Sequence, residues 1–342
     1  SARSKQSLQQ ANVLRIRARY CSSLIVPLID RLLLGLLQAI DTDGAAQLCY
    51  AVGRVPLVAD VALVADSGFF EGNLPAITTG LRGLCAAEIH VSGPFQDLHS
   101  GMYGGAVANP VNALAAIVAA LKGPDGRIAI PGFYDDVRPL EGTERAALAA
   151  IPFDEEAFRA GLGVPALAGE AGWSTLERIG ARPTLDVNGI WGGFTGDGSK
   201  TIIPAHAHAK ISCRLVMAQD PARIALQVEA ALKAAAPRGL QVEVRNLGNG
   251  YPFLTPLGDP YLQAAANALK ETFGADPLYL REGGSIPIAA LFQRELSLPV
   301  VLLGFTPPDD NAHAPNESMD LGNFEGGIRT VIRALDAIAA LR

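Results

Sequence analysis

The chain contains few of the residues that mark disulfide-rich or aromatic-rich proteins. Of its 342 residues, four are cysteines and 6% are aromatic. Cys21, Cys49, Cys85 and Cys213 lie far apart and form no CxxC pair. Dispersed thiols are typical of small buried residues in a reducing compartment, and no secretory signal is evident. We therefore predict a cytoplasmic protein without a disulfide framework.

Positive charge is also scarce outside the first part of the chain. The formal net charge is −6. Residues 1–54 hold seven Lys and Arg against three Asp, whereas the remaining residues hold 21 against 31 acidic residues. An acidic chain of this kind does not attract the phosphate backbone, so we expect no nucleic-acid partner.

No apolar run is long enough to predict a membrane span. The stretch from Ser23 to Ile40 is strongly apolar, but Asp30 and Arg31 interrupt it. A spanning helix needs about 20 consecutive apolar residues. The pattern indicates a buried or amphipathic helix, with a helix on a membrane surface as the open alternative. We expect no membrane partner.

A dinucleotide-binding fingerprint is absent as well. Glycine-rich loops occur, but no G-x-G-x-x-G lies between a predicted strand and a predicted helix. Nucleotide binding is therefore the least favoured function for this sequence.

From residue 55 onwards, the sequence has the patterns of an α/β protein. Apolar or alternating runs predict strands at 58–65, 88–93, 201–204, 207–216, 241–245, 278–281 and 299–304. Asp-Pro pairs predict the starts of helices at 220–236 and 259–273, because Asp caps a helix and Pro fits its first turn. Further helices are expected at 109–121, 141–150, 154–160, 286–292 and 323–341.

The order of these elements predicts two domains. Residues 1–86 and 257–342 are expected to form an α/β domain, with a mainly parallel sheet flanked by helices. Residues 87–256 read as an inserted two-layer α/β sandwich. Residues 1–54 differ in composition from the rest and form an atypical start.

Several residues could carry chemistry. Asp66 follows an apolar strand, and His313 lies between small residues and a proline, so both are candidate metal ligands. A structural cap for Asp66 and a hydrogen-bonded structural role for His313 are the alternatives. Arg214 is central to an apolar strand and needs an anionic partner, which is either a structural ion pair or a ligand.

Two further features are discounted. Glu155-Glu156 follows Asp154 and is expected to begin a helix. His206 and His208 alternate on a predicted strand and so share one face, but no third metal ligand is nearby in the sequence.

A set of motifs carries a resemblance to a known family. They occur in order over about five-sixths of the chain: Ala65-Asp66-Ser67-Gly68, Thr79-Gly80-Leu81-Arg82-Gly83-Leu84, Asp97-Leu98-His99-Ser100-Gly101, Gly192-Gly193-Phe194-Thr195-Gly196, Lys200-Thr201-Ile202-Ile203-Pro204, Glu282-Gly283-Gly284-Ser285-Ile286-Pro287 and His313-Ala314-Pro315-Asn316-Glu317. With these motifs, the chain resembles the M20 family of metal-dependent amidohydrolases, in particular its carnosinase-like dipeptidase branch.

The resemblance implies a catalytic domain that holds two zinc or manganese ions per subunit. Asp66 would bind one ion and His313 the other. In the family, a water or hydroxide between the metals attacks the amide carbon, and a glutamate takes its proton.

The resemblance also implies an inserted lid that forms a homodimer. His99 would donate to the developing oxyanion across the dimer. Arg214 would grip the free carboxylate of a dipeptide or N-acyl amino acid. Four more residues would line the substrate site: Asn188 and Thr201 from the lid, and Gly284 and Ser285 from the catalytic side.

The family's remaining metal ligands and its general base precede the position of Asp66, and they are missing. The first histidine is His90 and the first glutamate is Glu71. Either residues 1–54 replace the usual start, or the sequence belongs to a longer protein. In a chain complete as written, two ligands would not hold a tight pair of metals, and amidase activity would be weak. The alternative function is then a non-catalytic remnant that dimerises.

Overall fold

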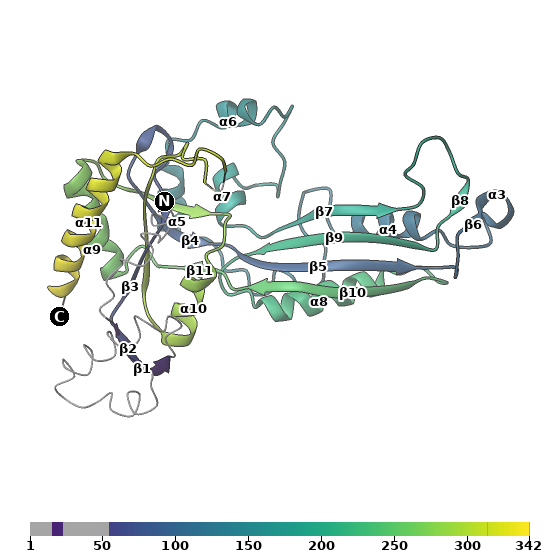
Figure 1. The fold of residues 1–342 in the computed structure, drawn as a ribbon, viewed down its shortest axis with the longest axis horizontal. Coiled ribbons are helices and arrows are strands. Elements are labelled where there is room, and N and C mark those ends of the chain that lie inside the picture. The colour runs from purple at the N-terminus through teal and green to yellow at the C-terminus, as the bar shows by residue number, and fades with distance from the viewer. Residues whose placement is uncertain (1–15, 23–54, 313, 342) are drawn as a thin grey trace, which may run out of the picture. The chain divides into compact units, whose positions relative to one another are not determined.

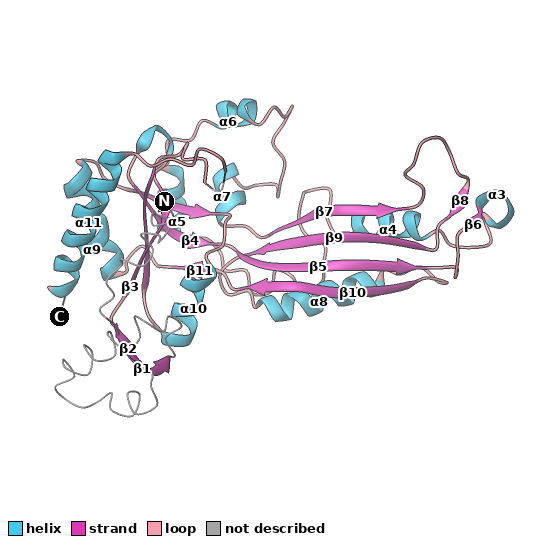
Figure 2. Cartoon of the chain, viewed as in Figure 1, coloured by secondary structure: helices cyan, strands magenta, loops and turns pink. Residues whose placement is uncertain are grey.

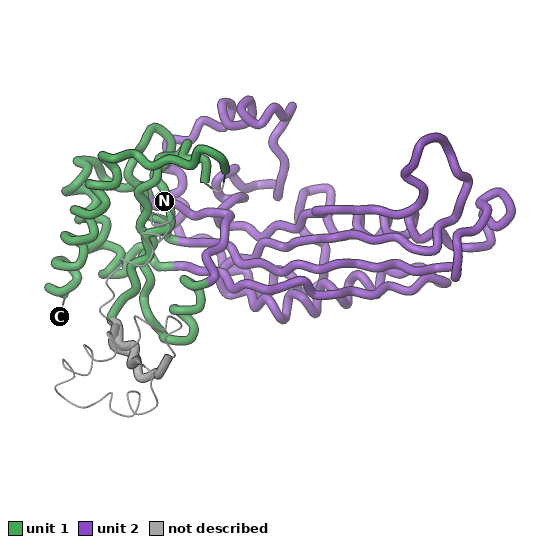
Figure 3. The backbone as a smooth tube through the Cα atoms, viewed as in Figure 1, with its two compact units in different colours: residues 1–79, 255–278, 288–342 green, residues 80–254, 279–287 purple. Residues whose placement is uncertain are grey.

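The computed structural model describes residues 16–22, 55–312 and 314–341 (Figure 1). The chain divides into two compact units, which are coloured separately in Figure 3. Unit 1 comprises residues 1–79, 255–278 and 288–342, and unit 2 comprises residues 80–254 and 279–287. The sequence placed these divisions at 86/87 and 256/257, and it did not separate the segment 279–287 from its flanks. The predicted helix within 23–40 lies outside the described residues.

Unit 1 is built on β3 (Ala62–Gly68), β4 (Ala76–Leu81) and β13 (Val300–Thr306). β13 pairs in parallel with β3 and antiparallel with β4, so the sheet is mixed. Six of the seven residues of β13 are buried, as its apolar sequence predicts. Helices α9 (Pro260–Phe273) and α11 (Leu321–Ala339) lie side by side and contact β13 (Figure 1).

The remaining strands of this sheet are short. β11 (Phe253–Leu254) pairs with the last two residues of β4, and β12 (Leu278–Glu282) pairs with β4 as well. Helix α10 (Pro287–Leu296) and the 3-10 turn η2 (Glu71–Asn73) complete the elements around the sheet. In the sequence before β3, β1 (Ile16–Ser22) pairs antiparallel with β2 (Val55–Ala59).

Unit 2 contains a four-stranded antiparallel sheet in the order β10-β5-β9-β7. Its strands are β5 (Gly83–Ser92), β7 (Thr184–Gly192), β9 (His206–Leu215) and β10 (Gln241–Gly250). Buried and exposed residues alternate along β5 and β9, because one face of the sheet is covered and the other is open.

Helices α4 (Pro110–Ala119) and α8 (Pro221–Ala234) cover the buried face (Figure 2). Apolar residues of both helices, among them Ile117 and Leu232, pack against Ile89 and Ile211 of the sheet. This arrangement confirms the two-layer sandwich. Asp220 caps α8 through its Oδ1, which accepts from the N–H groups of Ala222 and Arg223, as the Asp-Pro pair predicts.

The rest of unit 2 consists of connections. A two-stranded ribbon of β6 (Leu98–His99) and β8 (Ile202–Ile203), with the short helix α3 (Ser100–Tyr103), lies at one end of the four-stranded sheet (Figure 1). Between α4 and β7 lie α5 (Gly142–Ala149), α6 (Glu155–Gly161) and α7 (Thr175–Gly180). Glu155 and Glu156 begin α6 behind the N-cap Asp154, which confirms the prediction for this acidic pair.

Two sequence predictions differ from the structure. The run 58–65 was predicted to be one strand, but β2 ends at Ala59 and β3 begins at Ala62, and Asp66 lies inside β3 instead of at its tip. β7 was not predicted at all. Among the described helices, none combines the length and the apolarity needed to cross a membrane.

Candidate functional site

Arg214 lies on the open face of the unit 2 sheet, near the end of β9. Its neighbours Cys213 and Leu215 point into the core and are buried, so the alternation of the strand turns the guanidinium outwards. Across the sheet, Arg214 is opposite Leu84 of β5 and Thr184 of β7.

The hydroxyl group of Ser285 connects Arg214 to the strand junction between β4 and β5. The Nη1 of Arg214 donates to Ser285 Oγ at 3.3 Å, and Ser285 Oγ donates to the backbone carbonyl of Arg82 at 2.6 Å. The backbone N–H of Arg82 in turn donates to the carbonyl of Glu282 at 3.3 Å. The backbone of one residue, Arg82, therefore binds both ends of the Glu282–Ser285 loop.

The side chain of Arg82 lies against the same loop. Its Nη1 is 3.4–3.5 Å from the carbonyl oxygens of Arg178 and Arg182 and from Thr184 Oγ1. Its Nε is buried and has no hydrogen-bond partner among the described residues. A Cβ atom at Gly283 would be 2.6 Å from Arg82 Nη2, so only glycine fits at this position without moving the guanidinium.

The cluster around Arg82 and Arg214 has an excess of positive charge. In the described part of the chain, the ion pairs of unit 2 are made by other cations, and neither Arg82 nor Arg214 has a carboxylate within 4.0 Å. The pKa of Arg82 is lowered to about 10, first by burial and then by the charge of Arg214, while Asp186 partly offsets both. The Arg82 guanidinium therefore remains charged at neutral pH, beside the guanidinium of Arg214.

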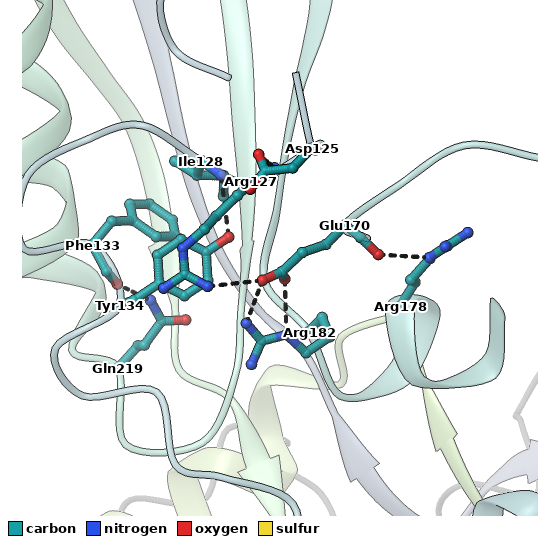
Figure 4. Close-up of polar contacts among 9 residues, drawn as sticks. All are labelled: Asp125, Arg127, Ile128, Phe133, Tyr134, Glu170, Arg178, Arg182 and Gln219. Carbon is teal, nitrogen blue, oxygen red and sulfur yellow. Dashed lines mark hydrogen bonds and ion pairs between the residues drawn. The ribbon is translucent and has the colours of Figure 1, made fainter. Parts of the chain in front are cut away.

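Arg178 and Arg182, whose carbonyls contact Arg82, belong to a network of polar contacts around Glu170 (Figure 4). Glu170 accepts from Arg182 through both carboxylate oxygens, at 2.8 and 2.7 Å, and from Arg127 at 3.0 Å. Its backbone carbonyl accepts from Arg178 Nε at 3.0 Å. The network therefore fixes the two residues whose carbonyls face Arg82.

Three other predicted site residues of unit 2 lie away from Arg214. Asn188 is exposed in the middle of β7, beside a bulge. Thr201 and His99 are exposed at the far end of the sheet, where the Thr201 carbonyl accepts from Ser100 N–H at 2.8 Å. Arg214 is eight residues along β9 from His206, the first residue of the strand, which corresponds to about 26 Å. In one chain, His99 and Thr201 do not share a pocket with Arg214.

The surroundings of His99 are ordered by short contacts. Its Nδ1 accepts from the backbone N–H of Gly101 at 3.0 Å, which caps α3. The nearby Asp97 accepts from the backbone N–H of Ala205 at 2.8 Å and so ties the loop to the start of β9. His99 is consequently presented on an anchored turn. Gly284, the remaining predicted substrate residue, is exposed and has open space around its Cβ position.

The predicted metal ligands are only partly described. Asp66 is exposed on β3 in unit 1, and His313 lies outside the described residues. In the described part of the chain, no three His, Cys, Asp or Glu side chains gather in an arrangement that could hold a metal ion. These residues do not by themselves supply a complete metal site.

Three histidines gather on the open face of the unit 2 sheet. His206 and His208 share this face, as the sequence predicts, and His90 joins them from β5. His90 Nε2 is 3.1 Å from His206 Nδ1, while the His208 ring stacks between His90 and Trp191. Stacking keeps the third ring parallel to its neighbours, which agrees with a structural role for the cluster.

Comparisons with known proteins show which proteins this chain is similar to. Residues 79–240 match the peptidase dimerisation domain of the M20 family. The chain is 33% identical over 290 residues to the Cys-Gly metallodipeptidase dug1 of Schizosaccharomyces pombe, covering 83% of this chain and 60% of that protein. It is 31% identical over 274 residues to the human Beta-Ala-His dipeptidase, covering 79% and 54%. The chain is homologous to the M20 metallodipeptidases.

A solved structure supports the same relationship. The M20 family metallo-carboxypeptidase Sso-CP2 from Sulfolobus solfataricus aligns with a TM-score of 0.73 and 28% identity, over 90% of this chain and 66% of that one. The resemblance stated from the motifs is confirmed, as is the α/β class with an added sandwich. The chain spans little more than half the length of the curated relatives.

The sequence assigned Arg214 and Ser285 to one substrate site and gave Arg82 no role. The structure brings Arg214 and Ser285 into contact, and their binding of substrate stays a prediction. Arg82 stands in the quoted stretch Thr79–Leu84, directly after an apolar strand. A charged residue at that place is ambiguous, because its burial and its neighbours depend on the loop at 282–285, which is 200 residues away in sequence.

Proposed function

We propose that this chain acts in metal-dependent hydrolysis of dipeptides, or of N-acyl amino acids, that bear a free carboxylate. The observation that carries the proposal is the contact between Arg214 and Ser285, beside a second arginine without a carboxylate partner among the described residues. Buried or partly buried cations need an anion, and a substrate carboxylate has the planar shape that a guanidinium binds with two hydrogen bonds.

The relatives support this class of substrate. The two relatives are a Cys-Gly metallodipeptidase and a Beta-Ala-His dipeptidase, and both names describe substrates with a free C-terminus. Their common activity favours hydrolysis over the alternative of a non-catalytic remnant. In this proposal, unit 1 is the catalytic domain and unit 2 is the lid and dimerisation domain, in a cytoplasmic protein.

The metal would be zinc or manganese, with Asp66 and His313 among its ligands. A bound divalent ion of this type polarises a carbonyl group and lowers the pKa of a bound water. Arg214 orients the substrate through its carboxylate, and Ser285 fixes the direction of the Arg214 side chain. Asn188 and Gly284 are proposed to line the substrate site, without an assigned contact.

His99 and Thr201 are proposed to act on the site of a second copy in a homodimer. Within one chain they are separated from Arg214 by most of β9. A histidine that donates to a developing oxyanion contributes about 3–4 kcal/mol. The matched dimerisation domain, residues 79–240, contains both residues and supports this arrangement.

The test combines metal analysis with an assay of paired substrates. We expect the purified protein to hold a divalent metal and to hydrolyse Cys-Gly or β-Ala-His, with activity lost to a chelator and restored by Zn²⁺ or Mn²⁺. Arg214→Ala should lower kcat/KM for free dipeptides about 10–100-fold, the range expected from hydrogen bonds to a charged group.

C-terminally amidated dipeptides provide the control, because they lack the charge that Arg214 binds. Their kcat/KM should change little in Arg214→Ala. Equal losses for free and amidated substrates would contradict the role of Arg214. Absence of both bound metal and turnover in the wild-type protein would instead favour the non-catalytic remnant.

A further inference from the structure

The strongest unexplained feature of the molecule is the charge of Arg82. Its guanidinium is largely buried, yet its three hydrogen-bond contacts are 3.4–3.5 Å long and its Nε has no partner among the described residues. Contacts of that length are weak. A residue kept only to fasten two segments would be expected to make shorter bonds or to pair with a carboxylate.

The surroundings of Arg82 add positive charge instead of compensating it. Arg214 is close enough to repel it, and the opposing Asp186 is 62% exposed and pairs with Lys122 at 3.5 Å. Two like charges in a partly buried site are unfavourable in the free protein. The repulsion is relieved when an anion binds between or beside them.

The backbone of Arg82 is also hydrogen-bonded to the Glu282–Ser285 loop. The Arg82 N–H donates to the Glu282 carbonyl, and the Arg82 carbonyl accepts from Ser285 Oγ. Ser285 Oγ in turn accepts from Arg214. One residue therefore both shapes the loop and places a charge behind it. The close approach of Gly283 to Arg82 Nη2 keeps that charge against the loop.

We propose that Arg82 is a positioning residue whose positive charge, added to that of Arg214, selects ligands with a free carboxylate at Ser285. Arg82 does not touch the ligand itself. It acts through the Ser285 loop and through its electrostatic potential, which is weakly screened in a partly buried site. The inference rests on the proposed function only in naming the carboxylate as that of a dipeptide or N-acyl amino acid.

The variants Arg82→Gln and Arg82→Lys separate charge from contact. Gln removes the positive charge, whereas Lys keeps the charge and loses the planar set of N–H donors of the guanidinium. Arg245→Gln is the matched control, because Arg245 is also in unit 2 but is 73% exposed and pairs with Glu88. Circular dichroism and melting curves establish that each variant is folded.

Binding is measured by calorimetry with N-acetylglycine and N-acetylglycinamide, which differ in the carboxylate. We expect the wild-type protein to prefer the acid. Arg82→Gln should bind the acid about 5–20-fold more weakly and the amide nearly unchanged, as removal of a charge several ångströms away predicts. Arg82→Lys should retain most of the affinity. With dipeptides, the KM of Arg82→Gln should rise while kcat changes little.

Equal losses for acid and amide, or a Lys variant as weak as the Gln variant, would show that Arg82 only fastens the loop and would overturn the inference. An unchanged Arg82→Gln would overturn it as well, while the proposed function stands. A wild-type protein that prefers the acid through Arg82 but hydrolyses nothing would uphold the inference and reject the function. Absence of any acid preference would reject both.

Discussion

At the scale of single residues, Cys85 and Cys213 face each other across β5 and β9, and both are buried as free thiols. Burial raises the pKa of Cys85 to about 11, and burial followed by the neighbouring Cys85 raises the pKa of Cys213 further. The nucleophile in thiol chemistry is the thiolate. These two cysteines are therefore packing residues of the sandwich, as the dispersed spacing predicts.

This arrangement predicts that alkylating reagents spare both cysteines in the folded protein. Raising the pKa of Cys85 from 9.0 to about 11 lowers its thiolate fraction about 100-fold near pH 8, and burial also blocks access. Native protein treated with iodoacetamide should show almost no label on the Cys85 and Cys213 peptides by mass spectrometry, and urea-unfolded protein should be labelled on both. Similar labelling rates in the two states would contradict their burial.

Individual roles could be predicted from the sequence where a side chain is out of place in its local pattern. Arg214 interrupts an apolar strand, and that is enough to predict an anionic partner. Arg82 could not be assigned in the same way, because its charge follows a strand in an ordinary position. Its burial, its repulsion by Arg214 and its link to Ser285 all arise from segments distant in sequence.

At the scale of elements, the long connection between α4 and β7 is held by charge as much as by apolar packing. Glu170 binds Arg182 and Arg127, and the side chains of Glu170 and Arg182 are 8% and 7% exposed (Figure 4). The ring of Trp173 lies under the guanidinium of Arg182 at 4.3 Å. A buried carboxylate shared by two arginines leaves both cations unpaired when it is removed.

Glu170→Ala is therefore expected to destabilise unit 2 by about 3–5 kcal/mol, the range for breaking one side of a buried pair. Urea unfolding followed by tryptophan fluorescence reports this directly, because both tryptophans, Trp173 and Trp191, lie in unit 2. Glu156→Ala is the control, since its pair with Arg159 is exposed, and it should change the midpoint little. A midpoint for Glu170→Ala equal to that of the control would show that the network does not stabilise the fold.

Elements with strong local signals were predicted and are confirmed, among them α8 and α9 with their Asp caps. β7 was missed because Asp186, Asn188 and Gly189 are poor strand residues. Its extended conformation comes from pairing with β9 at the edge of the sheet, including a bulge between Val187 and Gly189. Such a strand is determined by its neighbour, and a single sequence carries no signal of that neighbour.

At the scale of the whole molecule, the separation of His99 and Arg214 along one sheet makes subunit complementation a direct test of the proposed homodimer. His99→Ala and Arg214→Ala each remove one contribution to every site. In a mixed dimer, one site receives His99 from one chain and Arg214 from the other, while the second site lacks both.

Mixing the two impaired variants under conditions of subunit exchange should recover roughly a quarter of the wild-type activity, because half of the dimers are mixed and each has one complete site. The control mixes His99→Ala with the double variant His99→Ala/Arg214→Ala, in which no site can be completed. Failure to recover activity, despite mixed dimers detected by mass spectrometry, would contradict the transfer of His99 between subunits.

The α/β class and the sandwich could be predicted for the whole molecule, because the motifs and periodic segments occur in order. The metal centre could not be completed by the same reasoning. Of the two predicted ligands, the described residues include Asp66 alone, and the chain covers 60% of its fission-yeast relative. Residues that share a metal site are distant in sequence, so their number and geometry follow from tertiary structure.

The turn after His99 also determines which of its ring nitrogens carries hydrogen. The Gly101 amide points its proton at Nδ1, and a neutral imidazole that accepts there holds its own proton on Nε2. The Gly101 amide therefore selects one tautomer of the neutral ring, in which Nε2 is the donor. An amide carbonyl that gains negative charge would meet a proton already in place.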